Sequence, residues 1–340
     1  MYSRTSSNNK QSTRRTMVLA AACLALTQAI PFAAHAQSDY PNRPIRFLVG
    51  FAPGGSADTV ARAVAQDLSK ALGQSVVVEN KAGASAHLAT QALLAAPADG
   101  YTILFAGLTL ATNPALMKDV GYNPEKDLTM VSQLTAMPVV VVVPGKSPLN
   151  NLQDLIDASK AKPGGLMFSS GGVGTSAHLG PELFTRVSGI KYTHVPYRGG
   201  APALQGLIGG ETEVMFDTAV TPMHRANVEA GKIKFLGVMQ KDPIASYPSI
   251  KSAGAQGISP DAFMRSWQGV AVRSGTSPAI VAKLHTTISS VLRNKDVIDR
   301  LVGAGTEVTP SASPAEFQKL YLDELARWTV VIKAAGIKGD

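Results

Sequence analysis

Two junctions of the same design constrain this chain more than any other feature. Each consists of an apolar run, a cluster of glycine and hydroxyl residues, and then a helical pattern, over residues 51–58 and again over residues 168–178. The start of a helix offers unpaired backbone N–H groups and a partial positive charge. Glycine lets a ligand approach that backbone, and Ser or Thr adds hydroxyl donors. One such junction is a candidate anion site, and two in different halves suggest a clamp.

In the first junction, Pro53 fixes φ, Gly54 and Gly55 free the backbone, and Ser56 is the predicted N-cap. An ordinary capped turn has the same chemistry. Asp58 suits the first helical turn, but as an anion it would repel a ligand carboxylate unless it faces away or accepts a hydrogen bond from the ligand. The ligand-binding candidates here are Phe51, Pro53, Gly54, Gly55, Ser56 and Asp58.

The second junction places three glycines between residues 170 and 174, without the lysine of a phosphate-binding loop or the glycine spacing of a dinucleotide fingerprint. Its G-x-S-x-H run is close to a nucleophile elbow, which leaves a serine hydrolase using Ser176 and His178 as an alternative. His178 and Glu182 have metal-ligand spacing but no third partner, so no metal is predicted. The ligand-binding candidates are Ser170, Gly172, Gly174, Thr175, Ser176 and His178.

Other candidates follow neighbouring strands. Ser85 lies in a small-residue loop that opens a helix, Gly107 follows the third predicted strand, and Asp217 ends a later one. In open α/β sheets, ligands bind beyond the carboxyl ends of strands, where such residues gather. Arg198, in a turn, either attracts an anion or is simply solvated.

Residues 1–36 are predicted to be a signal peptide, because a basic start precedes an apolar run and an A-x-A site ending at Ala36. The expected location is the periplasm, by the Sec or the twin-arginine route. The lone Cys23 and four basic residues leave with this leader, so the formal charge falls from +8 to +4. A mature chain without cysteine excludes disulfides and thiolate metal sites, and its scattered charges exclude a nucleic-acid footprint. No stretch is long enough to span a bilayer.

Strand and helix patterns alternate, which predicts parallel α/β sheets. The predicted strands are 45–51, 76–78, 101–105, 139–143, 166–170, 214–217 and 233–239, and the predicted helices are 57–72, 152–160, 175–187, 201–208 and much of the C-terminal tail. Extended stretches at 130–143 and 265–272 are the expected crossings between two domains. Lobe 1 is then discontinuous, residues 41–137 plus 266–338, and lobe 2 is residues 138–265, with a two-strand hinge between them.

Several motifs together resemble the Bug-type, TctC-like periplasmic substrate-binding proteins of tripartite tricarboxylate transporters. They cover nearly the whole mature chain in order: residues 41–46, 51–55 with Asp58, Glu79-Asn80, 99–102, 172–179, 195–199, Phe216-Asp217 and Trp267-x-Gly269. One departure is the run Ala84 to Ala89, which replaces a glycine-rich loop. Pro181 is a milder one.

The resemblance implies a type II periplasmic-binding fold with two α/β lobes and a hinge. It also implies a small organic carboxylate bound between the lobes, at the two junctions and at Asp217, and delivery to the membrane permease subunits of a tripartite transporter. The expected protein is a monomer without cofactor or enzymatic activity. A periplasmic ligand sensor is the second reading, and the altered 83–89 loop leaves the ligand class open.

Overall fold

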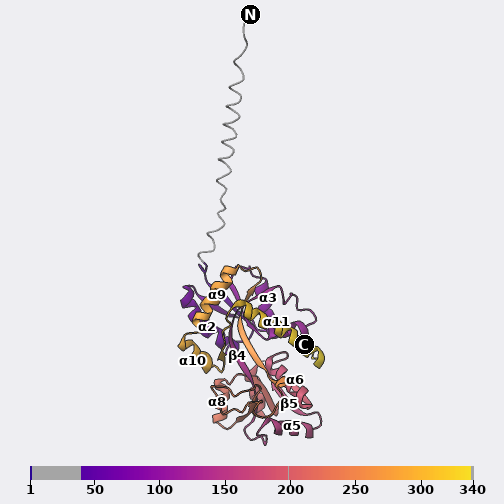
Figure 1. The fold of residues 1–340 in the computed structure, drawn as a ribbon. Helices are drawn as coiled ribbons and strands as arrows, with labels where there is room; N and C mark the ends of the chain where they lie inside the picture. The colour runs from indigo at the N-terminus through magenta and orange to yellow at the C-terminus, as the bar shows by residue number, and fades with distance from the viewer. Residues whose placement is uncertain (2–39, 198, 338–340) are drawn as a thin grey trace. The chain divides into compact units, whose positions relative to one another are not determined.

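The computed structural model describes Met1, residues 40–197 and residues 199–337. The predicted leader lies outside the described residues, apart from Met1. The chain from Pro41 onward forms one compact unit (Figure 1). Among the helices described, none is long and apolar enough to cross a membrane.

One continuous sheet runs through this unit. Its strand order is β2-β1-β3-β9-β4-β7-β5-β6, and β8 and β10 also pair with β4. The strands are β1 (Ile45–Val49), β2 (Val76–Asn80), β3 (Thr102–Gly107), β4 (Leu128–Pro144), β5 (Leu166–Ser170), β6 (Tyr192–Pro196), β7 (Val214–Thr218), β8 (Ile233–Val238), β9 (Arg265–Arg273) and β10 (Glu307–Val308).

The prediction of parallel sheets holds at each end of this order and fails at its centre. β1 is parallel to β2 and β3, and β5 is parallel to β6 and β7. By contrast, β9 is antiparallel to β3 and β4, and β4 is antiparallel to β7 and β8. The fold is therefore mixed α/β. Each half contains a group of parallel strands, and antiparallel central strands join the two groups.

β4 is the strand that joins the two halves. It spans 17 residues, pairs with β9 along residues 128–138, and pairs with β7 and β8 along residues 139–144. Val139–Val143, predicted as a strand on its own, is the second part of it. The partners of β4 change at the residue where the boundary between lobes was predicted. The division into two moving lobes itself stays a prediction.

Helices cover both halves, and Figure 1 shows β4 running from the group containing α2, α3, α9 and α11 to the group containing α5, α6 and α8. Their bounds are α2 (Ser56–Leu72), α3 (His87–Leu94), α4 (Thr109–Leu116), α5 (Leu152–Ala161), α6 (Ser176–Ser188), α7 (Gly200–Gly209), α8 (Pro222–Glu229), α9 (Pro278–Val291), α10 (Lys295–Gly303) and α11 (Pro314–Ala335). α2 begins one residue before the predicted helix 57–72. It buries Val60, Val64 and Leu68 on one face, and Gly73 ends it at φ 66°.

An apolar stripe of the C-terminal helix packs into the core. Phe317, Tyr321, Leu325, Trp328 and Ile332 of α11 are all buried. The rings of Phe317 and Trp267 of β9 meet edge to face, with centroids 5.4 Å apart. This is a favourable geometry for aromatic pairs, so α11 fixes the central strand from one side.

Alanine substitutions at two glycines are expected to change the free energy of unfolding in opposite directions. A Cβ on Gly269 would lie 2.3 Å from Phe317 Cζ and 2.7 Å from Ser132 O, whereas a Cβ on Gly303 would meet nothing within 4 Å. Gly269→Ala is expected to lower the free energy of unfolding by about 1–3 kcal/mol through overpacking. Gly303→Ala is expected to raise it by up to about 1 kcal/mol through helix propensity. Urea unfolding measures both, and a Gly269→Ala protein as stable as wild type would contradict the packing described.

Candidate functional site

The first junction connects β1 to α2. Gly54 has φ 83°, and Gly55 is the N-cap residue of α2, without a side-chain cap. The prediction that Ser56 is the N-cap is therefore wrong by one position. Its hydroxyl instead donates to Met137 Sδ of β4 at 3.3 Å. Ser56 is the first helical residue, and Pro53 beside the glycines is exposed.

Hydrogen bonds to the carboxylate of Asp58 hold this loop in its conformation. Its carboxylate accepts hydrogen bonds from Gly54 N at 2.9 Å, Arg62 Nε at 3.0 Å and Asn80 Nδ2 at 2.8 Å. Asn80 Nδ2 also donates to Phe51 O at 3.0 Å. Burial acts to raise the pKa of Asp58, but these hydrogen bonds outweigh it and the pKa is lowered. The carboxylate is thus ionised and bonded to its own loop.

The second junction connects β5 to α6, and two of its glycines have backbone angles that favour glycine. Gly172 has φ 131° and Gly174 has φ 74°. Gly172 N donates to Ser170 Oγ at 3.2 Å, and Gly174 N donates to His178 Nδ1 at 3.1 Å. Thr175 is the N-cap residue of α6, and its hydroxyl donates to Gly172 O at 2.7 Å. Two backbone amides expected to face a ligand are therefore bonded within the loop.

A stacked pair of imidazoles lies under this loop. The rings of His178 and His194 of β6 lie parallel within 5°, with centroids 3.9 Å apart, and His194 Nε2 is 2.7 Å from Ser170 Oγ. Burial, with a smaller effect of His194, lowers the pKa of His178 to about 3. Because Nδ1 of the neutral ring accepts from Gly174, the proton sits on Nε2, which faces Glu182 Oε1 at 3.8 Å. His194 was missed from the sequence, where a lone histidine in a strand carries no signal.

The helix starts keep donors that the loops do not use. The first hydrogen bonds described within α2 and α6 are donated by Thr59 N to Gly55 O and by His178 N to Thr175 O. The amides of Ser56 and Ala57 in α2, and of Ser176 and Ala177 in α6, precede them and have no partner within the helix. With the positive ends of two helix dipoles, these four N–H groups are candidate donors to an anion.

The turn Ala84–Ala86 between β2 and α3 has an unusual backbone. Ala84, Ser85 and Ala86 have φ values of 44°, 52° and 70°. The left-handed conformation costs an L-residue roughly 1–2 kcal/mol, so three in succession need support from their surroundings. Asn113 Nδ2 of α4 supplies part of it by donating to Ser85 O at 3.0 Å.

Contacts through this turn and α4 connect the first half of the sheet to the second junction. Ser85 Oγ donates to Val173 O at 3.3 Å, and Thr112 Oγ1 of α4 donates to Gly174 O at 3.1 Å. Both acceptors belong to the loop before α6. The structure therefore brings predicted site residues of both halves together here.

The two remaining described candidates, Gly107 and Asp217, differ in how near their contacts bring them to the junctions. Gly107 ends β3 opposite Gln268 of β9, and no contact described for it reaches either junction. Asp217 lies nearer: a Cβ on Gly200 would be 2.8 Å from its Oδ2, and Gly200 in turn borders Gly171. Arg198 lies outside the described residues.

Asp217 forms a buried acid–base pair with His224 of α8. The distance from Asp217 Oδ2 to His224 Nε2 is 3.4 Å, and Thr218 N donates to Asp217 Oδ1 at 2.7 Å. Burial raises the pKa of Asp217 to about 7, against the effect of the Thr218 hydrogen bond, and burial lowers the pKa of His224 to about 4. At pH 7 the imidazole of His224 is therefore neutral, and the carboxyl of Asp217 is about half ionised.

The geometry does not favour a serine nucleophile. Both nitrogens of His178 are directed elsewhere, Nδ1 to Gly174 N and Nε2 toward Glu182. The serine that does meet a histidine, Ser170, is fully buried. Across the described residues, no group of three or more His, Cys, Asp and Glu could hold a metal ion.

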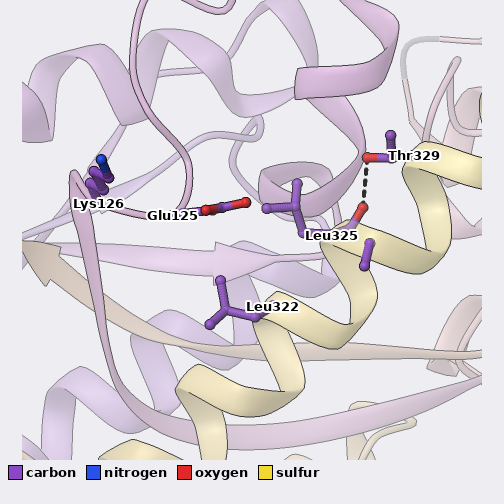
Figure 2. A pocket seen from close by; sticks show the side chains of 6 residues that line it. Glu125, Lys126, Leu322, Leu325 and Thr329 are labelled. Atoms are coloured by element: carbon purple, nitrogen blue, oxygen red, sulfur yellow. Dashed lines mark hydrogen bonds between the residues drawn. The ribbon is translucent and has the colours of Figure 1, made fainter.

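A pocket of about 670 Å³ lies elsewhere, along α11 (Figure 2). Its lining mixes apolar side chains with one acid and one lysine: Glu125, Lys126, Leu322, Leu325, Ala326 and Thr329. None of these residues belongs to a junction, and the pocket has no helix start in its lining. Its side-chain donors are Lys126, next to Glu125 in the chain, and Thr329, whose hydroxyl donates to Leu325 O at 2.7 Å.

The role of His178 as an acceptor for the loop can be tested with two variants. His178→Asn keeps an oxygen near the position of Nδ1, whereas His178→Leu leaves Gly174 N buried without a partner. His178→Leu is expected to lower the free energy of unfolding by about 1–3 kcal/mol relative to His178→Asn. Urea unfolding at pH 7 measures the difference, and equal stability of the two variants would contradict the acceptor role.

The lowered pKa of His178 also predicts a pH dependence. In the unfolded chain the ring binds a proton below pH 6.5, whereas in the folded chain it stays neutral until about pH 3. Its contribution to stability is therefore complete above pH 6.5 and is lost as pH falls toward 3. His224 acts in the same direction, and Asp217, with its raised pKa, acts in the opposite one.

His224 and Asp217 are unchanged in His178→Asn. The difference between wild type and variant in the slope of stability against pH therefore reports the protonation of His178 alone. Between pH 6 and 4, wild type should lose about 1.4 kcal/mol per pH unit more than the variant. Denaturant unfolding across that range measures both slopes. Identical slopes would mean that His178 is protonated in the folded protein.

Comparison with known proteins identifies the family of this chain. The family model described as "Tripartite tricarboxylate transporter family receptor" matches residues 60–337. Protein BugT of Bordetella pertussis (strain Tohama I) is 34% identical over 302 residues, which cover 88% of this chain and 91% of that protein.

Two solved structures carry bound carboxylates. R. palustris Rpa4515 with adipate is 32% identical, with a TM-score of 0.81 over 88% of this chain and 99% of the other. MatC (Rpa3494) from Rhodopseudomonas palustris with bound malate is 31% identical, with a TM-score of 0.77 over 86% and 100%. The predicted α/β fold of the periplasmic-binding type is thereby confirmed. This chain belongs to the receptor family of the tripartite tricarboxylate transporters, a family of periplasmic substrate-binding proteins.

Proposed function

We propose that the protein captures a small organic carboxylate between the starts of α2 and α6 and delivers it to the permease of a tripartite transporter. The observation that carries this proposal is the pair of helix starts from the two halves of the sheet, each with free N–H groups. The relatives with adipate and malate support the ligand class. We propose no catalytic role, since the side chains near the loops hold the backbone in place.

The direct contacts would be backbone amides and hydroxyls. Ser56, Ala57, Ser176 and Ala177 supply the amides, and Ser56 and Ser176 also carry hydroxyls. A hydrogen bond to a charged group contributes about 1.5–3 kcal/mol, so four offer about 6–12 kcal/mol before ordering costs. Micromolar binding needs about 8 kcal/mol, and neutral donors therefore suffice without an arginine.

Capture would involve closure of two lobes, residues 41–137 plus 266–338 and residues 138–265. β4 runs through the boundary and β9 begins at it, and the two would form the hinge. Because each lobe supplies one helix start, only the closed form makes the full set of hydrogen bonds, and the ligand shifts the equilibrium toward it. The hydrogen bonds of Ser85 and Thr112 to the second junction belong to this closed arrangement.

We also propose that the basic, apolar leader directs export, and that the mature receptor acts in the periplasm as a monomer without a cofactor. A ligand sensor would use the same site and close in the same way. Growth on the ligand by a strain lacking the permease separates the two, since a sensor does not depend on that permease.

Proline at the first helical residue tests the amide contacts. Thr175 has extended backbone angles, φ −74° and ψ 162°, which a following proline requires. Ser176→Pro should therefore fold while losing both the N–H and the hydroxyl, whereas Ser176→Ala loses only the hydroxyl. Calorimetry with malate should show binding that is at least about tenfold weaker for Ser176→Pro than for Ser176→Ala.

The same pair at Ser56, which follows an extended Gly55, tests the other helix start. Circular dichroism and thermal melts confirm that each proline variant is folded. Wild-type affinity in both proline variants would rule out the amide clamp.

A further inference from the structure

Two side chains of β6 pack against the N-terminal part of α6. Tyr192 and His194 are two residues apart and so lie on the same face of the strand, while Thr193 between them is exposed. On α6, His178 and Glu182 are four residues apart and lie on one face of the helix. The two pairs meet in register, His194 against His178 and Tyr192 against Glu182.

The ring of His194 fixes the orientation of the ring of His178. The two rings are parallel within 5°, with centroids 3.9 Å apart. The lone pair of Nδ1 lies in the plane of its ring, so this stacking directs it toward Gly174 N, at 3.1 Å. His194 Nε2 also lies 2.7 Å from Ser170 Oγ, which accepts from Gly172 N at 3.2 Å. The stacked rings therefore hold two amides of the second junction, one directly and one through Ser170.

The hydroxyl of Tyr192 holds the carboxylate that faces the other side of His178. It donates to Glu182 Oε1 at 2.5 Å, and the same oxygen lies 3.8 Å from His178 Nε2. Burial and the hydrogen bond to Glu182 raise the pKa of Tyr192, so its hydroxyl keeps the proton that it donates. A negatively charged oxygen facing Nε2 favours the tautomer with the proton on that nitrogen. This tautomer leaves Nδ1 free to accept from Gly174 N.

We propose that Tyr192 and His194 are positioning residues for the carboxylate site, acting through Glu182 and His178 on the loop before α6. The inference rests on the proposed function, because it concerns the same site. Without these two side chains, the ring of His178 turns or changes tautomer, and Gly174 N loses its acceptor. Gly174 directly precedes Thr175, the N-cap residue of α6, so the amides of the first turn then lose their fixed direction toward the ligand.

Tyr192→Phe tests this role by removing one hydroxyl. Tyr197→Phe is the matched control, because Tyr197 OH makes the same kind of bond, to Glu211 Oε2 at 2.7 Å, but packs against Gly206 of α7. In calorimetric titrations with malate, Tyr192→Phe is expected to bind about fivefold more weakly than wild type, and Tyr197→Phe as tightly as wild type.

Nitrogen-15 NMR of the ligand-free protein gives a readout that a loss of stability alone does not move. In wild type the proton of His178 is expected on Nε2. Tyr192→Phe should raise the fraction with the proton on Nδ1 and shift the amide resonance of Gly174, whereas Tyr197→Phe should leave both unchanged.

Two variants of His194 separate stacking from hydrogen bonding. His194→Phe keeps a flat ring against His178 and loses the bond to Ser170, whereas His194→Leu loses both. His194→Leu is expected to bind malate at least about tenfold more weakly than wild type, and His194→Phe should recover part of that loss. Circular dichroism and thermal melts show which variants fold. If His194→Leu does not fold, Tyr192→Phe still decides the question, since it removes a single oxygen.

Unchanged His178 and Gly174 resonances in Tyr192→Phe, or a malate affinity equal to that of Tyr197→Phe, would overturn the positioning role and leave the carboxylate site intact. A wild-type protein that binds neither malate, succinate nor adipate would overturn the proposed function, and the role in binding with it.

Discussion

The positions of the two halves of the sheet depend on β4, which pairs first with β9 and then with β7 and β8. A single strand of 17 residues belongs to both halves of the sheet, so each half is positioned by backbone hydrogen bonds along the same element. The parallel strands on either side place their carboxyl ends, and therefore their loops, at defined edges. The contacts of Ser85 and Thr112 with the second junction show that these edges face one another.

At both junctions the side chains hold the loop in place, while the backbone of the helix start remains free. Asp58 binds Gly54 N in the first loop, and His178 and Ser170 bind the amides of the second. Each of these groups was a candidate ligand contact. Their hydrogen bonds hold both loops in place, which under the proposed function would reduce the ordering cost of binding. The buried histidines remain neutral, so the donors available to an anion are dipoles rather than charges.

The sequence predicted local structure well wherever one periodicity dominated. The helix 57–72, with Val60, Val64 and Leu68 on one face, differs by one residue from α2, and the strand 166–170 coincides with β5. The extended crossing predicted at 130–143 covers most of β4, but only 139–143 was predicted as a strand, because the first part of β4 alternates small, polar and apolar residues that pair with a strand more than a hundred residues away. The antiparallel centre of the sheet was missed for the same reason, since pairing partners leave no local pattern.

The candidate site was predicted as a set of loops but not as a set of contacts. Glycine and hydroxyl clusters identified both junctions, yet they could not show that Gly172 and Gly174 amides are bonded internally or that Ser56 is one residue inside its helix. His194 depends on a partner from another strand, and the left-handed turn at 84–86 contradicts the local preference of Ala and Ser. These are features of tertiary context, which overrides propensity at strained positions.

The most direct measurement is a titration of the isotope-labelled protein with malate, monitored by backbone amide NMR shifts. The account predicts that the amides of Ser56 and Ala57 in one half and of Ser176 and Ala177 in the other shift together, saturate at one equivalent, and report the same dissociation constant. Shifts confined to a single helix start, or two unequal dissociation constants for the two halves, would contradict a carboxylate held between them.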